Sequence, residues 1–170
     1  MDNNITQQNS LTADYHSDGK IYKFRYYELA NYDHLDRARI RQVYGVCFYQ
    51  DKMVIVLNGK KQTWGLAGGT LRIGESIEET LKREVEEESN MQVLKWRPIG
   101  VQEVTDPNGN LYYQLRVVCK VKPVGEFLSD PAGTITEIKL INPIDYITYF
   151  NWGEIGEKII QRAVQLRPKL

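Results

Sequence analysis

The sequence has few of the residues that mark several common classes of protein. It holds only two cysteines and two histidines in 170 residues, so neither a disulfide framework nor a zinc site of clustered Cys and His is expected. Lysine plus arginine equals aspartate plus glutamate at 22 each, so no net positive charge favours nucleic-acid binding. No run approaches the ~20 apolar residues of a membrane span, and the polar start, Met1 to Ser10, lacks the apolar run of a signal peptide. We therefore expect a cytoplasmic protein without a membrane or nucleic-acid partner.

The composition is typical of one globular domain with additions at its N-terminus. Hydrophobic residues make up 42% of the chain and charged residues 26%. Residues 1–19 are polar and rich in Asn, Gln, Ser and Asp, which predicts a flexible segment. Residues 20–37 carry alternating aromatics that predict a short strand at 21–28. We expect this extension to cover the main domain, residues 38–170, or to contact a second copy in a homodimer.

The main domain shows the pattern strands, helix, strands, terminal helix. Strands are predicted at 42–49, 53–57, 92–96, 99–105, 111–121 and 137–141. A terminal helix is predicted over 154–166, and the segment from Lys122 to Gly133 is long enough for a functional loop. This order predicts an α/β (α+β) sandwich in which helices cover a mixed sheet.

The stretch from Gly68 to Met91 carries an unusual arrangement of acidic residues. On a helix, Glu84 and Glu88 lie about 40° apart and Glu87 lies about 60° to the other side of Glu84. The apolar stripe that should face the core consists of Ile77, Leu81 and Val85. The carboxylates therefore crowd beside the core, where they repel one another and resist the loss of water. A divalent cation with a preference for oxygen ligands would suit them, and a charged surface helix is the alternative.

The same stretch resembles the Nudix box, the signature of the Nudix hydrolase family. The box reads Gly, five residues, Glu, seven residues, Arg-Glu, an aliphatic residue, any residue, Glu-Glu, any residue, Gly and an aliphatic residue. Its fixed positions are taken here, in order, by Gly69, Glu75, Arg83, Glu84, Val85, Glu87, Glu88, Asn90 and Met91. Every charged position matches. Asn90 replaces the box glycine, and asparagine also tolerates the left-handed conformation of a helix C-cap.

The resemblance, which extends over residues 38–168, implies a fold and a chemistry. The fold would be an α/β/α sandwich with a mixed sheet and the box as loop-helix-loop. The activity would be hydrolysis of a phosphoanhydride bond in a nucleoside diphosphate derivative with Mg²⁺ or Mn²⁺. The implied metal ligands are the carbonyl of Gly68 and the carboxylates of Glu84, Glu87 and Glu88. Arg83 would orient these catalytic glutamates, and Glu75 would support the loop through Arg83.

Other roles remain open. A carboxylate must accept the proton of the attacking water, and Glu84 or Glu88 is the first candidate, with Glu137 after them. Arg39, Arg41 and Arg116 are candidates for contacts with substrate phosphates, Glu137 is a further candidate at the substrate, and a solvated strand is the alternative for each arginine. The substrate could be a nucleotide sugar, an ADP-ribose-like compound, a dinucleoside polyphosphate or an oxidised nucleoside triphosphate. A Nudix-fold module that senses a nucleotide without cleaving it is the second hypothesis.

Overall fold

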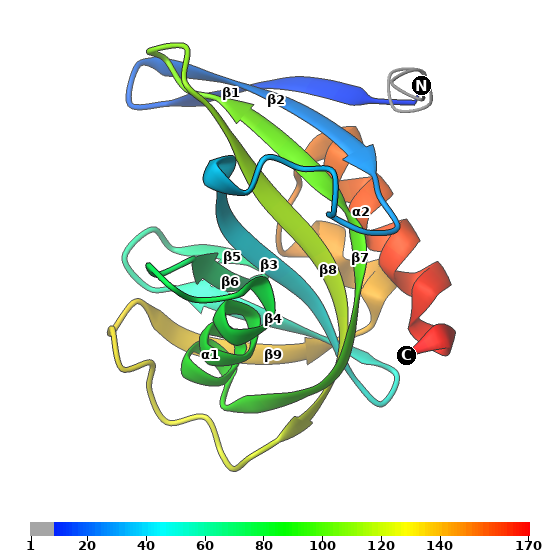
Figure 1. Cartoon of the computed structure of the whole chain (residues 1–170). Helices are drawn as coiled ribbons and strands as arrows, with labels where there is room; N and C mark the ends of the chain where they lie inside the picture. The colour runs from blue at the N-terminus through cyan, green and yellow to red at the C-terminus, as the bar shows by residue number, and fades with distance from the viewer. Residues whose placement is uncertain (1–8) are drawn as a thin grey trace.

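A computed structural model describes residues 9–170, which form a mixed β-sheet between helices (Figure 1). The strands are β1 (Leu11–Ser17), β2 (Lys20–Glu28), β3 (Ile40–Tyr49), β4 (Lys52–Asn58), β5 (Thr63–Gly65), β6 (Ala67–Thr70), β7 (Met91–Thr105), β8 (Leu111–Pro123) and β9 (Ile135–Ile141). The α-helices are α1 (Ile77–Ser89) and α2 (Gly153–Leu166). Short 3-10 helices cover Arg37–Arg39, Pro143–Thr148 and Arg167–Lys169.

The sheet runs in the order β1-β2-β7-β8-β3-β4-β5, with β6 paired to β3 and β9 paired to β4. Strands β3 and β8 are parallel, and the other pairs are antiparallel. The parallel pair places β3 beside β8 although a long stretch of chain, including α1, separates them. Residues that are distant in the sequence therefore meet in the middle of the sheet.

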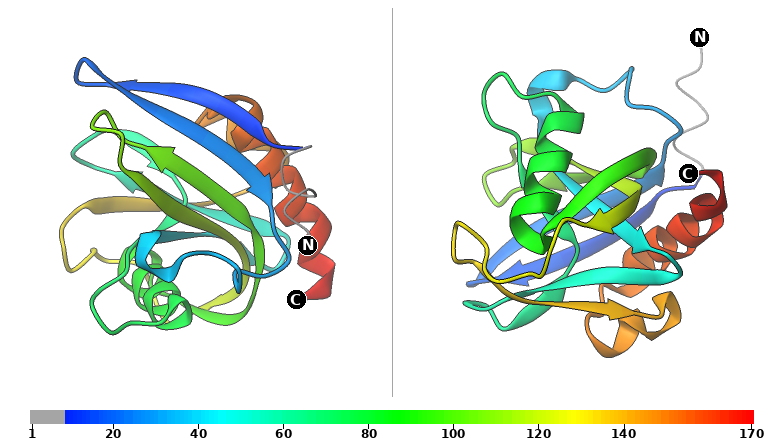
Figure 2. Two further views of the ribbon diagram at one scale, coloured as in Figure 1. Left: turned by 45° about the horizontal axis from the view of Figure 1, so that its top comes forward. Right: turned by 90° about the horizontal axis from the view of Figure 1, so that it is seen from below.

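The two α-helices cover opposite faces of the sheet, as the right panel of Figure 2 shows. Leu81 and Val85 of α1 are fully buried in one apolar cluster, and Ile155 and Ile159 of α2 are buried in a second. Burial of each such side chain stabilises the fold by about 1.5–3 kcal/mol. The predicted apolar stripe of α1 and the predicted α/β/α sandwich with a mixed sheet are confirmed.

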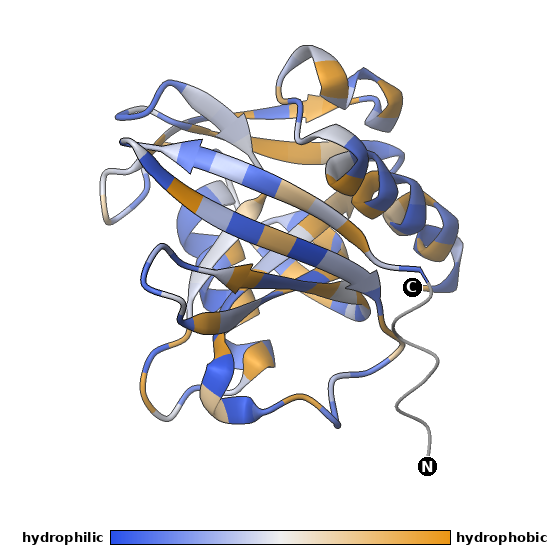
Figure 3. Ribbon diagram, turned by 90° about the horizontal axis from the view of Figure 1, so that it is seen from above, coloured by the Kyte–Doolittle hydropathy of each residue, from blue (hydrophilic) through white to orange (hydrophobic). Residues whose placement is uncertain are grey.

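The N-terminal segment differs from the prediction. Residues 1–8 lie outside the described residues, but residues 11–17, predicted to be flexible, form β1 and pair along β2. Asp18 and Gly19 make the turn at φ 50° and 72°, which suits a tight hairpin because both central residues of a type I′ turn need positive φ. Tyr15 stacks on Phe24 at a centroid distance of 5.6 Å. Figure 3 shows both hydrophilic and hydrophobic residues along this hairpin.

Two other local predictions also need correction. Strand β3 begins at Ile40 and not at the predicted residue 42, so it includes Arg41, whereas Arg37 and Arg39 lie in a 3-10 helix that is N-capped by Asp36. The segments on either side of Pro98 form one strand, β7, because a register shift between Pro98 and Gly100 accommodates the proline. No helix within residues 9–170 is long and apolar enough to cross a membrane.

Candidate active site

The ends of α1 are held by caps at both termini. The backbone nitrogen of Ser76 donates to Glu79 Oε2 at 2.8 Å, and the nitrogen of Glu79 donates to Ser76 Oγ at 3.2 Å, which completes a capping box. Asn90 ends the helix at φ 53° and ψ 38°, the left-handed conformation that the sequence predicts. Asn90 Nδ2 also donates to the carbonyl of Glu126 at 2.8 Å. These caps fix where each glutamate of the helix projects.

The two glycines of β6 bring the strand against the glutamates of α1. The backbone nitrogen of Gly68 donates to Glu88 Oε2 at 2.9 Å. A Cβ on Gly69 would lie 2.5 Å from Glu84 Cδ, so no larger residue fits there without moving that carboxylate. Gly68 has φ +150°, and a Cβ on it would lie 2.2 Å from the carbonyl oxygen of Val43. Gly69 is thus required by the close approach of β6 and α1, and Gly68 by the close approach of β6 and β3.

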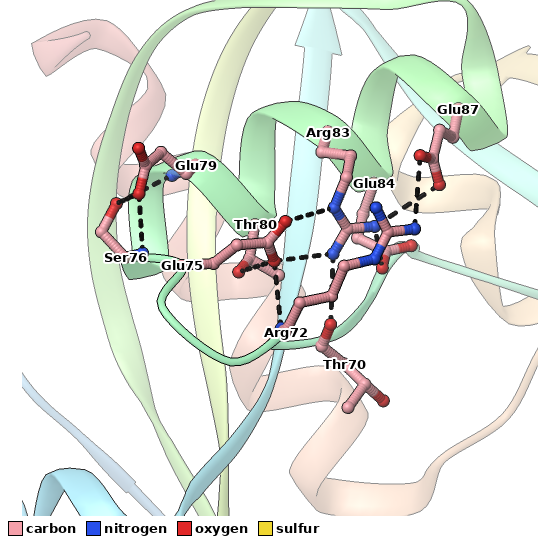
Figure 4. Close-up of polar contacts among 9 residues, drawn as sticks. All are labelled: Thr70, Arg72, Glu75, Ser76, Glu79, Thr80, Arg83, Glu84 and Glu87. Carbon is pink, nitrogen blue, oxygen red and sulfur yellow. Dashed lines mark hydrogen bonds and ion pairs between the residues drawn. The ribbon is translucent and has the colours of Figure 1, made fainter.

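Glu75 and Arg83 form a bidentate ion pair that closes the loop before α1 (Figure 4). Arg83 Nε donates to Glu75 Oε1 at 2.7 Å, and Nη2 donates to Oε2 at 2.9 Å. Thr80 Oγ1 and the backbone nitrogen of Arg72 donate to the same Oε2. The hydrogen bonds from Arg83 contribute most to lowering the pKa of Glu75 to about 2. Glu75 therefore remains a carboxylate that anchors Arg83.

The remaining guanidinium nitrogen of Arg83 points to the catalytic candidates. Its Nη1 donates to Glu84 Oε1 at 2.6 Å and to Glu87 Oε2 at 3.4 Å. Arg72 Nη2 lies 3.7 Å from Glu87 Oε1. The structure therefore brings Arg83, Glu84 and Glu87 together, with Glu75 as the anchor behind them.

Glu88 lies in surroundings that disfavour its charge. Burial raises its pKa most, the negative charges of Glu84, Asp130 and Glu87 raise it further, and the hydrogen bond from Gly68 opposes them, so the pKa reaches about 7. Within residues 9–170, no three Asp, Glu, His or Cys side chains are grouped closely enough to enclose a metal ion. The donor set nevertheless fits a hard cation, because crowded carboxylate oxygens are the ligands that Mg²⁺ and Mn²⁺ prefer and a cation would relieve the repulsion.

A cavity of about 660 Å³ adjoins these residues. Its wall is formed by the C-terminal half of α1 and by the loop between β8 and β9, through Arg83, Glu86, Glu87, Asn90, Glu126, Leu128, Ser129 and Pro131. Its volume is that of a typical small-molecule site. Asp130 stabilises the loop from within, since its carboxylate accepts hydrogen bonds from the backbone nitrogens of Ala132, Thr134 and Ile135.

In the described part of the chain, three other candidate residues form no hydrogen bond or ion pair with Glu84, Glu87 or Glu88. Arg39 pairs with Asp36 at 3.2 Å. Arg41 lies over the ring of Tyr112 at 4.5 Å and lines a separate cavity of about 240 Å³ near Asp106. Glu137 pairs with Lys139 at 3.6 Å on the exposed side of β9. Their proposed roles at the substrate therefore receive no support from direct contacts.

Arg116, the remaining candidate for a phosphate contact, belongs to a polar group on β3, β7 and β8 that the sequence analysis did not predict. The group consists of Gln42, Tyr44, Gln102, Gln114 and Arg116. Polar residues at every second position of an otherwise apolar strand, as at Gln114 and Arg116, are the signal that could have found it.

Comparison with known proteins gives a consistent picture. A family model described as NUDIX domain matches residues 39–162. The pyrophosphohydrolase BsRppH of Bacillus subtilis superposes with a TM-score of 0.67 at 11% identity, covering 84% of this chain and 91% of its own. A NUDIX-family hydrolase of Clostridium perfringens gives 0.59 at 18% identity, with 78% and 99% covered. A NUDIX hydrolase of Nitrosomonas europaea gives 0.58 at 21%, with 74% and 89% covered. No curated protein matches the sequence.

Proposed function

Because this chain belongs to the NUDIX domain family, we propose that it is a hydrolase that cleaves a phosphoanhydride bond in a nucleoside diphosphate derivative. The reaction would use Mg²⁺ or Mn²⁺. The candidate substrates are nucleotide sugars, ADP-ribose-like compounds, dinucleoside polyphosphates and oxidised nucleoside triphosphates. The proposal rests on the whole charged pattern of the box and on the geometry that supports it.

The observation that carries the proposal is the crowding of carboxylates at the junction of α1 and β6. Glu84 lies against Gly69, Glu88 accepts a hydrogen bond from Gly68, and Arg83 links Glu84 to Glu87. A diphosphate substrate is itself anionic, so an acidic site can bind it only through cations. Glu84, Glu87, Glu88 and the carbonyl of Gly68 would hold them. When bound, such an ion polarises the phosphoryl oxygen and acidifies a water molecule.

In the proposed reaction, a water oxygen attacks one phosphorus of the anhydride. The bond from that phosphorus to the bridging oxygen breaks, and the bridging oxygen leaves with the second phosphate. A carboxylate accepts the proton of the water. Glu84 and Glu88 are the first candidates for this base, and Glu88 accepts a hydrogen bond from Gly68 beside them. Arg83, anchored by Glu75, would hold Glu84 in place.

The test is hydrolysis of a panel of the four substrate classes by wild-type protein and by two glutamine variants. Glu88→Gln removes a proposed ligand and base at nearly constant shape. Glu78→Gln is the matched control, since Glu78 is exposed on the same helix and lies outside the cavity wall. We expect turnover by the Glu88→Gln protein to fall by roughly 10²–10⁴-fold, as for loss of a general base, while Glu78→Gln protein behaves as wild type.

Two outcomes would count against the proposal. Turnover of the Glu88→Gln protein near the wild-type rate at saturating metal would remove Glu88 from the mechanism. Failure of the wild-type protein to release product from any compound of the panel would favour the alternative of a nucleotide-sensing module.

A further inference from the structure

Arg116 is a buried cation whose donors are not all used. The residue is only 6% exposed. Nη2 donates to Gln114 Oε1 at 2.9 Å and to Gln102 Oε1 at 3.2 Å. Within residues 9–170, Nε is enclosed without a hydrogen-bond partner, and no carboxylate forms an ion pair with the guanidinium. A buried charge that lacks a counter-ion is costly, so its retention calls for an anionic partner.

The glutamine side chains around Arg116 use their amide oxygens to accept hydrogen bonds within the group, and one amide nitrogen remains unpaired among the described residues. Gln114 Oε1 accepts from Arg116 and also from Gln102 Nε2 at 3.3 Å. Gln114 Nε2 donates to Gln42 Oε1 at 2.7 Å, which leaves the amide nitrogen of Gln42 at the end of the chain of hydrogen bonds. Within residues 9–170, the group thus leaves Nη1 of Arg116 and the amide nitrogen of Gln42 without an acceptor, whereas Nε of Arg116 is enclosed. A ligand rich in acceptors would match it.

The position of Arg116 relates this group to the proposed catalytic residues. Gly68 is paired with Tyr44 across β6 and β3, and Tyr44 is paired with Arg116 across β3 and β8. With strands about 4.8 Å apart, the Cα atoms of Gly68 and Arg116 are separated by about 10 Å. The guanidinium carbon of Arg116 lies 4.8 Å from the centre of the Tyr44 ring. Tyr44 is also close enough to Glu84 and Glu88 for their charges to raise its pKa, after burial as the main cause.

From this geometry we propose that Arg116 binds a phosphate group of the substrate, with Gln42 as a second donor. The proposal rests on the proposed function and extends it: one phosphate would lie at the carboxylates near Gly68, and the next would reach past Tyr44 to Arg116. Nη1 is the guanidinium nitrogen that remains for this task, because Nη2 donates to both glutamines and Nε is enclosed. A charge-assisted hydrogen bond from Nη1 to a phosphate oxygen is the proposed contact. The phosphate would supply the negative charge that Arg116 lacks within the fold.

The test compares Arg116→Met and Arg116→Lys with the wild-type protein. Binding of an imido analogue of a nucleoside diphosphate, and of inorganic imidodiphosphate, is measured by calorimetry with Mg²⁺ present. Arg97→Met is the matched control, because Arg97 is an exposed arginine on the neighbouring strand β7. Thermal unfolding of each ligand-free protein provides the readout for a structural role. Lysine keeps the charge but lacks the guanidinium group that bonds both glutamines and the proposed ligand of Nη1, so Arg116→Lys serves if Arg116→Met fails to fold.

We expect Arg116→Met to weaken binding of both probes by at least tenfold, Arg116→Lys to weaken it by less, and Arg97→Met to leave it unchanged. We also expect the unfolding temperature of ligand-free Arg116→Met protein to be unchanged or higher, because removal of an unpaired buried charge is not destabilising. Weaker binding of the nucleotide probe alone would overturn the assignment to phosphate, since it would place Arg116 at the base or ribose. Unchanged affinity with a lower unfolding temperature would make Arg116 a structural residue.

These measurements separate the inference from the proposed function. If the wild-type protein hydrolyses its substrate and Arg116→Met protein retains the wild-type KM and kcat, the inference fails and the proposed function stands. If no substrate is cleaved but both probes bind in a manner that depends on Arg116, the inference stands and the catalytic proposal fails.

Discussion

Among single residues, Glu88 shows the clearest conflict between function and stability. Its carboxyl group lies beside Glu84 and Glu87 and accepts one hydrogen bond from Gly68. Its pKa of about 7 in the folded protein exceeds the ordinary value of 4.5. The folded state therefore holds the proton more tightly than the unfolded state does. The stability contributed by protonated Glu88 is complete below about pH 4.5 and is lost as pH rises to about 7.

Because the pKa of Glu88 is higher in the folded protein than in the unfolded chain, removal of its charge should stabilise the metal-free protein at high pH. Glu88→Gln should raise the free energy of unfolding at pH 8 by roughly 1–3 kcal/mol. This range lies below the free energy that corresponds to the full pKa shift, because the side chain is only half-buried and water screens its charge. At pH 4 the variant and the wild type should be nearly equal, since both side chains are then neutral. Urea unfolding with a chelator present at both pH values measures the difference, with Glu86→Gln as control. A gain of the same size at both pH values would contradict this account of Glu88.

Gly69 is the second residue whose local geometry leads to a specific prediction. A methyl group at this position would lie 2.5–2.7 Å from three atoms of the Glu84 carboxyl group. Gly69→Ala should therefore displace Glu84 and lower turnover by at least tenfold. The control is Gly125→Ala, whose Cβ would meet only Asn90 Nδ2 at 3.4 Å. Activity assays and metal titration of both variants test the point. Equal activity of the two would show that Glu84 can move without loss of function.

At the scale of elements, the end of α1 is joined to the loop that follows β8. Asn90 serves both, because its backbone adopts the left-handed conformation and its side chain donates to the carbonyl of Glu126. The glycine of the family pattern would satisfy the backbone and omit the contact with the loop. Asn90, the residue that replaces the box glycine, thus forms a hydrogen bond with Glu126, and both residues belong to the wall of the 660 Å³ cavity.

Two substitutions at Asn90 separate its roles. Asn90→Ala should lower the free energy of unfolding by about 1–2 kcal/mol, because alanine is disfavoured in the left-handed region. Asn90→Gly should change the free energy of unfolding little and should increase amide hydrogen exchange in residues 124–134. Chemical unfolding and hydrogen exchange of the two proteins measure these effects. Unchanged exchange in the loop of the Asn90→Gly protein would show that the side-chain contact does not hold the loop.

At the scale of the whole molecule, the N-terminal hairpin extends the sheet beyond the matched family region. Strands β1 and β2 lie outside residues 39–162, and β2 pairs with β7, so the extension continues the same sheet. Within residues 9–170, β1 pairs only with β2 and leaves its other edge open. This edge is where a second copy could pair, and the homodimer expected from the aromatic segment remains a prediction.

Long-range pairing also explains which site residues could be predicted. Glu84, Glu87 and Glu88 lie within one helix, and Glu75 reaches Arg83 across only eight positions. Their mutual placement follows from helix geometry and from a short loop. By contrast, Gln42 and Gln114 meet across 72 positions, and Arg116 and Tyr44 meet through the parallel pairing of β3 and β8. No local pattern contains such a contact.

The sequence by itself determined the local chemistry of this protein. The spacing of its charged residues specified the helix and the crowded carboxylates, because positions three and four apart on a helix share a side whatever the rest of the chain does. Asn90 specified the C-terminal cap, because asparagine tolerates the left-handed conformation. Only the tertiary structure decided how deeply Glu88 is buried, that Arg116 lies in the sheet without an ion pair to any carboxylate of residues 9–170, and that residues 11–17 form a strand. These outcomes depend on which strands pair, and pairing is settled by contacts between segments that are far apart in the chain.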